Sequence, residues 1–410
     1  MNRLPVPRPG RAAAEAFVDR HLVHVAGDAA RGSERFRGGQ SAADAALAAF
    51  DVAGYASRRN EVRPTARRGA SGLSPYIRHG LLTLPDVWRH VAGGPARDVA
   101  KFRDELLWQE YARHWYARLG AATGRGVRRE LAGSSADSPA PAAWDRSMAC
   151  LDANLAELER DGWLVNQSRM WLASHWAVRE AADWRSGEDA FFRHLLDGSR
   201  AANRLGWQWT AGVGSSKHYG FSRSQVRRRA PGLCDGCERR DDCPIEAWPD
   251  DPAFVPVERN PAVRFDPDVR RTRGPDDVER RGGGVAEAVW LTAESLGAED
   301  PASVARPDLP VVFVFDEPLL ARLQLSSKRL VFLVETLAER ALTRGVELWL
   351  GDPVAVLGGR RVAVTFAPVP GFRRRAGAIS PAEVHPWPWL ATPTGGPISS
   401  FSAWRRAVGR

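Results

Sequence analysis

The chain has 410 residues, enough for two or three domains, and with 44% hydrophobic and 26% charged residues it has the composition of a folded protein. It contains no run of about 20 apolar residues, which excludes a transmembrane helix, and its N-terminus lacks the apolar centre of a secretory signal, so we expect a cytoplasmic protein. Basic residues exceed acidic ones by nine, an excess that favours polyanionic partners without identifying one.

The first part of the chain reads as helical. Residues 1–35 are polar and rich in Gly, Ala and Arg, and we expect a lead-in made of one short helix and a loop. Residues 36–245 have helical periodicity throughout, with no convincing strand and with a Gly/Ser/Pro-rich loop at 124–141. The expected helices cover 42–54, 99–119, 144–158 and 166–182.

The second part reads as α/β. Residues 246–284 are rich in Pro, Arg, Asp and Gly and are expected to form a linker. Residues 285–410 contain short apolar runs typical of strands at 288–291, 311–315, 346–350 and 362–366. A helix is expected at 327–344, and a strand, a helix and a strand at this spacing predict a parallel unit with a right-handed crossover. We therefore predict a mainly α protein, with an all-helical domain followed by a small parallel α/β domain.

A family resemblance is carried by residues 162–212, GWLVNQSRMWLASHWAVREAADWRSGEDAFFRHLLDGSRAANRLGWQWTAG, which resemble the FAD-binding core of the photolyase/cryptochrome family. Three other segments agree in order and spacing. GASGLSPYIRHG (69–80) resembles the family's phosphate-binding GTSxLSPYLxxG, ELLWQEY (105–111) its ELxWREF, and GGQSAADAALAAFDVAGYASRRN (38–60) its entry helix. The resemblance covers about residues 38–230 and implies that the helical domain binds FAD.

The residues themselves are suited to a flavin. The turn at 71–74 opens a helix and offers uncharged donors to a diphosphate. Arg169 and Asp197 match the family's ion pair beside the isoalloxazine, and Asn203 matches the amide that faces the flavin N5. A buried carboxylate and guanidinium are stable in a dry pocket when they pair with each other. The implied FAD-binding set is Tyr55, Ser71, Gly72, Leu73, Ser74, Phe102, Arg169, Asp197, Gly198, Ser199 and Asn203.

A second set corresponds to positions that contact a cyclobutane pyrimidine dimer in members that repair it: Glu105, Trp108, Asn166, Met170 and Trp209. A dimer flipped out of the duplex needs an aromatic wall to stack on and a few polar groups to read it. A carboxylic acid such as Glu105 can hydrogen-bond the thymine carbonyls. Members that repair (6-4) photoproducts have His in place of Asn166 and Met170, so this pocket favours cyclobutane dimers.

The high tryptophan content, sixteen residues, has a partial explanation in the same resemblance. Trp207 and Trp184 match two members of the Trp relay that reduces the flavin by photoinduced electron transfer. Together with Glu105 they form the predicted catalytic set. The third member of the relay is left open among Trp144, Trp163 and Trp248.

The four cysteines suggest a metal centre. Cys234, Cys237 and Cys243 follow the pattern C-x2-C-x5-C-P, with Cys150 one helix upstream. In a cytoplasmic protein such a cluster favours metal binding over disulfides. The arrangement resembles that of iron–sulfur bacterial cryptochromes and photolyases and implies a [4Fe–4S] cluster; tetrahedral zinc and no metal are the alternatives. That subgroup is associated with (6-4) repair and photoreception, in tension with a pocket of the dimer-repair type.

The C-terminal block resembles the family's antenna α/β domain, over residues 287–304, 310–320 and 326–353, but in permuted order, because that domain normally comes first. Residues 293–297 (AESLG) replace the usual RxDLR after the first strand. The short domain and this replacement argue against an antenna chromophore, and a purely structural role explains the domain equally well.

These observations predict a light-driven repair flavoprotein, a deoxyribodipyrimidine photolyase-like lyase. It would be a monomer that transfers an electron from reduced FAD to cyclobutane dimers in damaged DNA, with phosphates held by Arg223 and by the arginines at 227–229. The alternatives are a photoreceptor without repair, a (6-4) photolyase, or a member without turnover. Ala70 in place of a phosphate-binding Thr, Ser199 in place of a second acid and the displaced α/β domain favour a photoreceptor.

Overall fold

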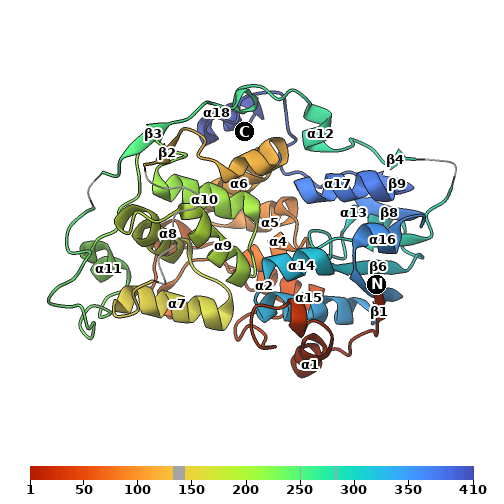
Figure 1. Cartoon of the computed structure of the whole chain (residues 1–410), viewed down its shortest axis with the longest axis horizontal. Helices are drawn as coiled ribbons and strands as arrows, with labels where there is room; N and C mark the ends of the chain where they lie inside the picture. The colour runs from red at the N-terminus through yellow and green to blue at the C-terminus, as the bar shows by residue number, and fades with distance from the viewer. Residues whose placement is uncertain (133–143, 250, 282–283) are drawn as a thin grey trace.

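The computed structural model describes residues 1–132, 144–249, 251–281 and 284–410. Figure 1 shows two parts, a group of helices formed mainly by residues 40–230 and a sheet formed mainly by residues after 285. In the described ranges, no helix combines the length and the apolar character needed to cross a bilayer.

The predicted helices of the first part are present with shifted ends. The helical elements are α1 (Arg11–His21), α2 (Gln40–Ala48), α3 (Tyr55–Arg58), α4 (Ser74–Arg78), α5 (Leu84–His90), α6 (Ala96–Leu119), α7 (Ala149–Asp161), α8 (Asn166–Ser174), α9 (Trp184–His194), α10 (Arg200–Ala211) and α11 (Arg223–Arg229). The expected single helix at 166–182 is instead α8 followed by a π-helical turn, His175–Arg179. The predicted loop at 124–141 falls partly outside the described residues.

The long helix α6 organises the helical part. Gly120 ends it with a φ of +56°, a left-handed conformation that is costly for residues with a Cβ atom. Its buried side chains include Leu106, Tyr111 and Trp115, which fix one face of the helix in the core. The neighbouring positions Glu105 and Trp108 are only half-buried and are turned toward the cavity described below.

The second part is built on a seven-stranded sheet, which is larger than the four strands predicted. Its strands are β1 (Asn2–Leu4), β4 (Glu279–Arg280), β5 (Ala288–Leu291), β6 (Val311–Asp316), β7 (Val346–Gly351), β8 (Val362–Thr365) and β9 (Glu383–His385), in the order β1-β7-β6-β5-β8-β9-β4. The pairs between β5 and β9 are all parallel, which confirms the predicted α/β unit. Its helices are α13 (Pro301–Ala305), α14 (Glu317–Leu323), α15 (Ser327–Arg340), α16 (Pro353–Leu357), α17 (Pro370–Ile379) and α18 (Phe401–Ala407).

The N-terminal lead-in contains the predicted helix, but its first residues are a strand that sequence analysis missed. β1 pairs antiparallel with β7, with Arg3 opposite Trp349. α1 packs on α15, where Arg11 forms a 2.8 Å ion pair with Glu335. Three residues are too few to show a strand period, and their pairing partner lies more than 300 residues away.

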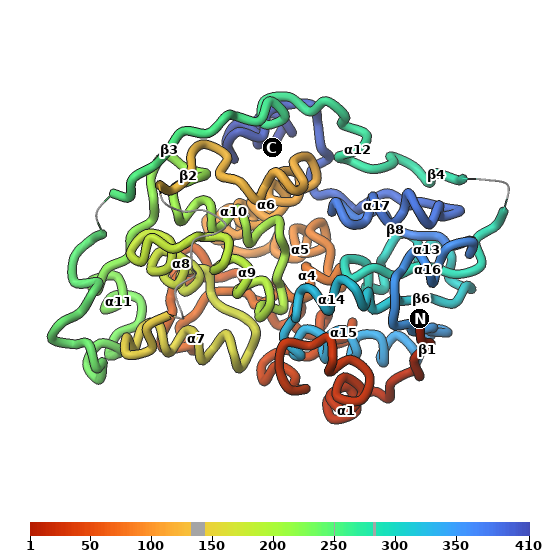
Figure 2. Tube along the Cα trace, in the orientation of Figure 1, coloured from red at the N-terminus to blue at the C-terminus, as the bar shows by residue number. Residues whose placement is uncertain are grey.

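The expectation of no strand between residues 36 and 245 was wrong. β2 (Arg129–Leu131) pairs antiparallel with β3 (Phe254–Pro256), which lies in the predicted linker. The linker also contains α12 (Val269–Arg273) and β4 at the sheet edge. In Figure 2 it runs along one edge of the molecule, from the region of α11 past α6 to the sheet. This segment supplies short strands to both parts, β3 beside β2 and β4 beside β9.

Candidate functional site

A cavity of about 1110 Å³ lies among the helices and extends to the carboxyl ends of β5 and β6. Its volume exceeds the range of roughly 300–1,000 Å³ typical of small-ligand sites. The predicted FAD set lines it with one exception, Leu73, which is fully buried in the core. All five residues of the predicted dimer set line the same cavity. The structure thus brings both sets to one place.

The segment predicted to bind a diphosphate forms the turn into α4. Gly72 has a φ of +70°, which favours glycine, and the Leu73 N–H donates to Ser71 Oγ at 3.3 Å. Trp163 Nε1 donates to Ser74 Oγ at 3.0 Å. Because a hydroxyl both accepts and donates, the Ser74 O–H remains a donor for a ligand in the cavity.

The ion pair of Arg169 and Asp197 is formed as predicted. Arg169 Nη2 lies 2.7 Å from Asp197 Oδ2, and its Nε donates to the Leu164 carbonyl at 2.9 Å. Asp197 is largely buried, and its Oδ1 has no hydrogen-bond partner in the described part of the chain. A buried oxygen without a partner costs about 1–3 kcal/mol, so it points to a ligand that donates to it.

The backbone next to this carboxylate is held by two arginines from different parts of the fold. The Gly198 carbonyl accepts from Arg78 Nε of α4 at 2.9 Å and from Arg329 Nη2 of α15 at 3.0 Å. Arg329 also donates to the Phe192 carbonyl, and its burial lowers the pKa of its guanidinium to about 9. A Cβ atom on Gly198 would lie 2.9 Å from Arg329 Nη1. The α/β part therefore helps to fix the loop that carries Asp197.

Replacing Arg329 with Met is expected to destabilise the protein by about 1–3 kcal/mol and to weaken FAD retention, because two buried carbonyls lose a donor. Thermal melts with and without added FAD measure both effects. Arg322→Met is the matched control, since this exposed arginine lines the same cavity from α14. Equal melting temperatures and equal FAD retention for the two variants would contradict the role given to Arg329.

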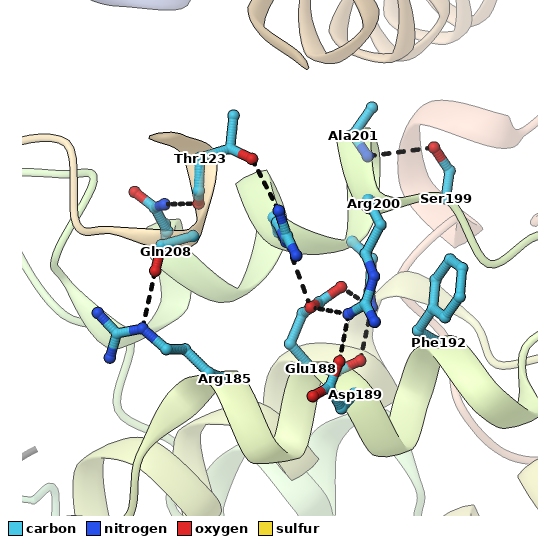
Figure 3. Close-up of polar contacts among 12 residues, drawn as sticks. Thr123, Arg185, Glu188, Asp189, Phe192, Ser199, Arg200, Ala201 and Gln208 are labelled. Carbon is cyan, nitrogen blue, oxygen red and sulfur yellow. Dashed lines mark hydrogen bonds and ion pairs between the residues drawn. The ribbon is translucent and has the colours of Figure 1, made fainter. Parts of the chain in front are cut away.

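Asn203 is oriented by a buried acid that sequence analysis missed. Its Nδ2 donates to the Glu188 backbone carbonyl at 2.9 Å and to Glu188 Oε1 at 2.8 Å. This leaves the side-chain carbonyl of Asn203 as the group that can accept from a ligand. Burial raises the pKa of Glu188, while Arg200 and Arg204 act against this rise. Figure 3 shows Arg200 reaching both Glu188 and Asp189.

Glu105 is held at the cavity wall by two cations. Its Oε1 lies 2.9 Å from Lys101 Nζ, one helical turn away on α6, and 3.5 Å from Arg59 Nε. The carboxylate is one-third exposed, so these pairs contribute little to stability, roughly 0–1 kcal/mol each.

The other four residues of the dimer set also line the cavity, and one of them is strongly exposed to solvent. Trp209 is 44% exposed, which is unusual for the largest side chain and leaves its ring available for contact. Asn166 and Met170 lie one turn apart on α8, with Asn166 Nδ2 4.0 Å from Met170 Sδ. Trp108 faces the same cavity from α6. Two indoles, an amide and a thioether thus line the same cavity.

A family model described as the FAD binding domain of DNA photolyase matches residues 102–230. Residues 102–230 belong to this FAD-binding family. The matched range includes most of α6 and all of α8 and α10, the helices that carry all five residues of the dimer set.

Curated relatives of this FAD-binding domain are deoxyribodipyrimidine photo-lyases. One from Synechococcus sp. is 30% identical over 193 residues, which cover 43% of this chain and 39% of that protein. One from Salmonella typhimurium is 34% identical over 175 residues, 39% of this chain and 36% of that protein. The chain thus spans about two fifths of the length of these relatives. The crystal structure of a Synechocystis sp. PCC6803 cryptochrome is 22% identical, with a TM-score of 0.41 over 51% of this chain and 46% of that one.

The two predicted relay tryptophans of the FAD-binding domain are both buried. Trp207 lines the cavity, and Gly187 lies so close to it that a Cβ atom there would be 2.2 Å from the indole. Trp184 lies one turn before Gly187 on α9. Neither indole N–H of Trp207 and Trp184 has a partner among the residues that the structure describes.

Ring contacts favour one of the three candidates for the outer relay position. Trp207 meets Phe191 at a centroid distance of 5.1 Å, and Phe191 meets Trp144 at 6.0 Å. Trp144 is half-buried, and the centroid of its ring lies 4.4 Å from that of Trp176. By contrast Trp163 donates its indole N–H to Ser74 in the turn at 71–74, and the candidate at position 248 is 54% exposed.

The four cysteines lie together, away from the flavin cavity. All four are free thiols and line one small cavity, bounded also by Arg223 and Arg240. Burial, and then the charges of the other three cysteines, raise the pKa of Cys150 to about 12. Four thiolates collected here repel one another, so the set suits a cationic centre. Yet in the described ranges no three Cys, His, Asp or Glu side chains are placed to ligate one metal ion.

Proposed function

We propose that this chain repairs cyclobutane pyrimidine dimers in DNA with light energy collected by bound FAD. The observation that carries the proposal is that one cavity joins the flavin set, around Asp197 and Asn203, to the dimer set, around Glu105 and Trp108. When bound, FAD supplies light-driven transfer of one electron to the dimer and recovers it after the dimer splits.

Different residues of the chain would bind different groups of FAD. The turn at Ser71 and Ser74 would donate to the diphosphate, and Asp197 Oδ1 would accept from a flavin N–H. The Asn203 carbonyl would accept from a second flavin N–H, since its amide protons are used by Glu188. Ser199, where an acid is usual, accepts from the Ala201 N–H as the cap of α10, a role that a neutral hydroxyl fulfils.

Illumination of the reduced holoprotein with dimer-containing oligothymidylate tests the proposal. Recovery of thymine absorbance under blue light supports dimer repair. Flavin photoreduction without thymine recovery contradicts it and favours the photoreceptor. A (6-4) substrate in a parallel sample separates the two lesions.

Replacing Glu105 with Gln is expected to slow repair about tenfold, because hydrogen bonds to a charged partner contribute about 1.5–3 kcal/mol and Gln keeps only the neutral part. The quantum yield of thymine recovery measures this change. Lys101→Met removes a partner of the carboxylate but not the carboxylate itself, so its yield should stay within about twofold of wild type. Equal quantum yields for E105Q and K101M would show that Glu105 takes no part in the repair reaction.

Replacing Trp144 with Phe is expected to lower flavin photoreduction by at least about tenfold, because phenyl rings are much harder to oxidise than indoles and Trp144 is the first indole that the ring contacts reach from Trp207. Transient absorption after a blue flash measures the yield. Trp248→Phe is the control, because that exposed indole lies outside the path. A W144F protein that photoreduces like W248F would place the outer relay elsewhere.

We propose further that the cysteine site holds a [4Fe–4S] cluster. Four free thiols that line one cavity offer the four thiolate ligands that such a cluster needs, and tetrahedral zinc is the alternative for the same thiols. For DNA, we propose binding as a monomer, with the exposed Arg227 and Arg228 contacting phosphates. Arg223 pairs with Glu246 at 2.7 Å, so the predicted arginine group would act only in part.

A further inference from the structure

The indole of Trp108 has a second aromatic neighbour outside the cavity. Phe401, the first residue of α18, lies with its ring centroid 4.1 Å from that of Trp108 and with an angle of 8° between the planes. Trp108 lines the cavity, whereas Phe401 does not. The C-terminal helix thus supports the indole from behind the wall that it forms.

The stacked pair belongs to a larger aromatic cluster. Tyr111 lies edge-on to Trp108 at 5.7 Å and to Phe401 at 5.9 Å. Trp404 lies 5.7 Å from Phe401 and 5.5 Å from Tyr111. The Tyr111 hydroxyl donates to the Ile398 carbonyl at 2.8 Å, which ties the cluster to the segment before α18.

Polar contacts fix α18 on α6. Trp404 Nε1 donates to His114 Nδ1 at 2.8 Å, and since an indole N–H only donates, the imidazole proton sits on Nε2 and is donated to the Ala391 carbonyl at 2.8 Å. Burial lowers the pKa of His114 to about 3, in agreement with this neutral tautomer. Arg405 pairs with Asp104 at 2.8 Å on the same side of the helix.

The anchoring positions on α6 follow a helical stripe. Asp104, Trp108, Tyr111 and His114 are spaced by four, three and three residues, so they lie on one face. Glu105 is the next residue after the first of them. The helix that presents the acid of the lesion pocket is therefore held by the last segment of the chain.

We propose that Phe401 is a positioning residue of the lesion pocket, which holds the Trp108 ring in the plane on which a pyrimidine dimer stacks. The inference rests on the proposed repair function. A flat ring packed behind the indole removes rotamers that would otherwise be lost on binding, and pre-organisation of this kind raises affinity without a new contact to the ligand. A residue of α18 thus supports the pocket wall from behind, without lining the cavity itself.

Three variants of the holoprotein test the inference by their affinity for a fluorescent oligothymidylate with one cyclobutane dimer. Phe401→Ala is expected to raise Kd about five- to tenfold, because the variant loses one aromatic stacking contact and the ordering of Trp108 that this contact provides. Phe401→Tyr keeps the flat ring and should retain wild-type affinity. Phe401→Leu keeps apolar volume without a flat face and should behave like F401A. Phe265→Ala, which removes an exposed ring elsewhere, is the control.

A second measurement needs no lesion. In protein labelled with 5-fluorotryptophan, the Trp108 fluorine resonance, assigned by Trp108→Phe, should broaden or split in F401A and F401L but not in F401Y. Flavin photoreduction and melting temperature in each variant separate a local change from a loss of folding.

The outcomes are distinct. If the wild-type protein binds the dimer and F401A or F401L binds it with the same affinity, the inference is overturned. The proposed repair function then still stands. An unchanged Trp108 resonance in F401A overturns the positioning role by itself. Absence of dimer binding by the wild type overturns the proposed function, and with it the lesion role of Phe401.

Discussion

Replacing Asp197 with Ala is expected to yield a folded protein that has lost most of its FAD. The change leaves the Arg169 guanidinium without its carboxylate and removes Oδ1, the buried acceptor without a protein partner in the described ranges. A hydrogen bond to a charged acceptor contributes about 1.5–3 kcal/mol, so loss of the carboxylate is expected to lower FAD affinity by roughly 10- to 150-fold. The flavin-to-protein absorbance ratio after gel filtration and a fluorescence titration measure it.

Two companion variants define what Asp197 does. Asp197→Asn keeps the shape without the charge and should fall between wild type and the alanine variant. Asp189→Ala removes a half-exposed acid that also pairs with an arginine of α10, and it should leave FAD affinity unchanged. Retention of FAD by D197A at the level of D189A would show that the flavin does not depend on this carboxylate.

The parts of the site that could be predicted are those encoded by local spacing. Asn166 and Met170 are one turn apart on one helix, and the turn at 71–74 contains Gly72 and is followed directly by Pro75, which favours the start of a helix. Such patterns involve residues that are only a few positions apart, so they place the side chains in the same way in any fold that forms the helix. The four parallel strands predicted after residue 285 also followed from short apolar runs, because strands buried on both faces are apolar throughout.

The parts that were missed depend on pairings across hundreds of residues. β1 reaches the sheet through β7, Arg329 reaches Gly198 from another part of the fold, and Phe401 reaches Trp108 from the end of the chain. Glu188 is one acid among many on helical surfaces until the fold buries it beside Asn203. A single sequence carries no signal for which distant segments meet, so these contacts needed the structure.

Replacing Cys237 with Ser is expected to remove iron and inorganic sulfide from protein purified without oxygen, from about four of each per chain to near zero. Cys237 Sγ accepts from the Ala149 N–H at 3.4 Å, so this thiol joins the loop at 231–245 to the start of α7. Loss of the centre should therefore loosen that loop and lower the melting temperature, since the binding energy of a structural metal centre is also folding energy. Metal analysis, sulfide analysis and thermal melts measure the three changes.

The control must come from outside the cysteines, because all four in the chain line the same cavity. Arg240→Ala fits, since this exposed residue borders the cavity and its side chain pairs with Asp241 at the surface at 3.4 Å, so the metal content of R240A should equal that of wild type. One zinc ion per wild-type chain, with no iron, would show that the cysteines hold tetrahedral zinc and not the cluster. Neither metal in anaerobic wild type would contradict the cluster, and C237S protein would then melt close to the wild-type temperature, because no metal-binding energy would be lost.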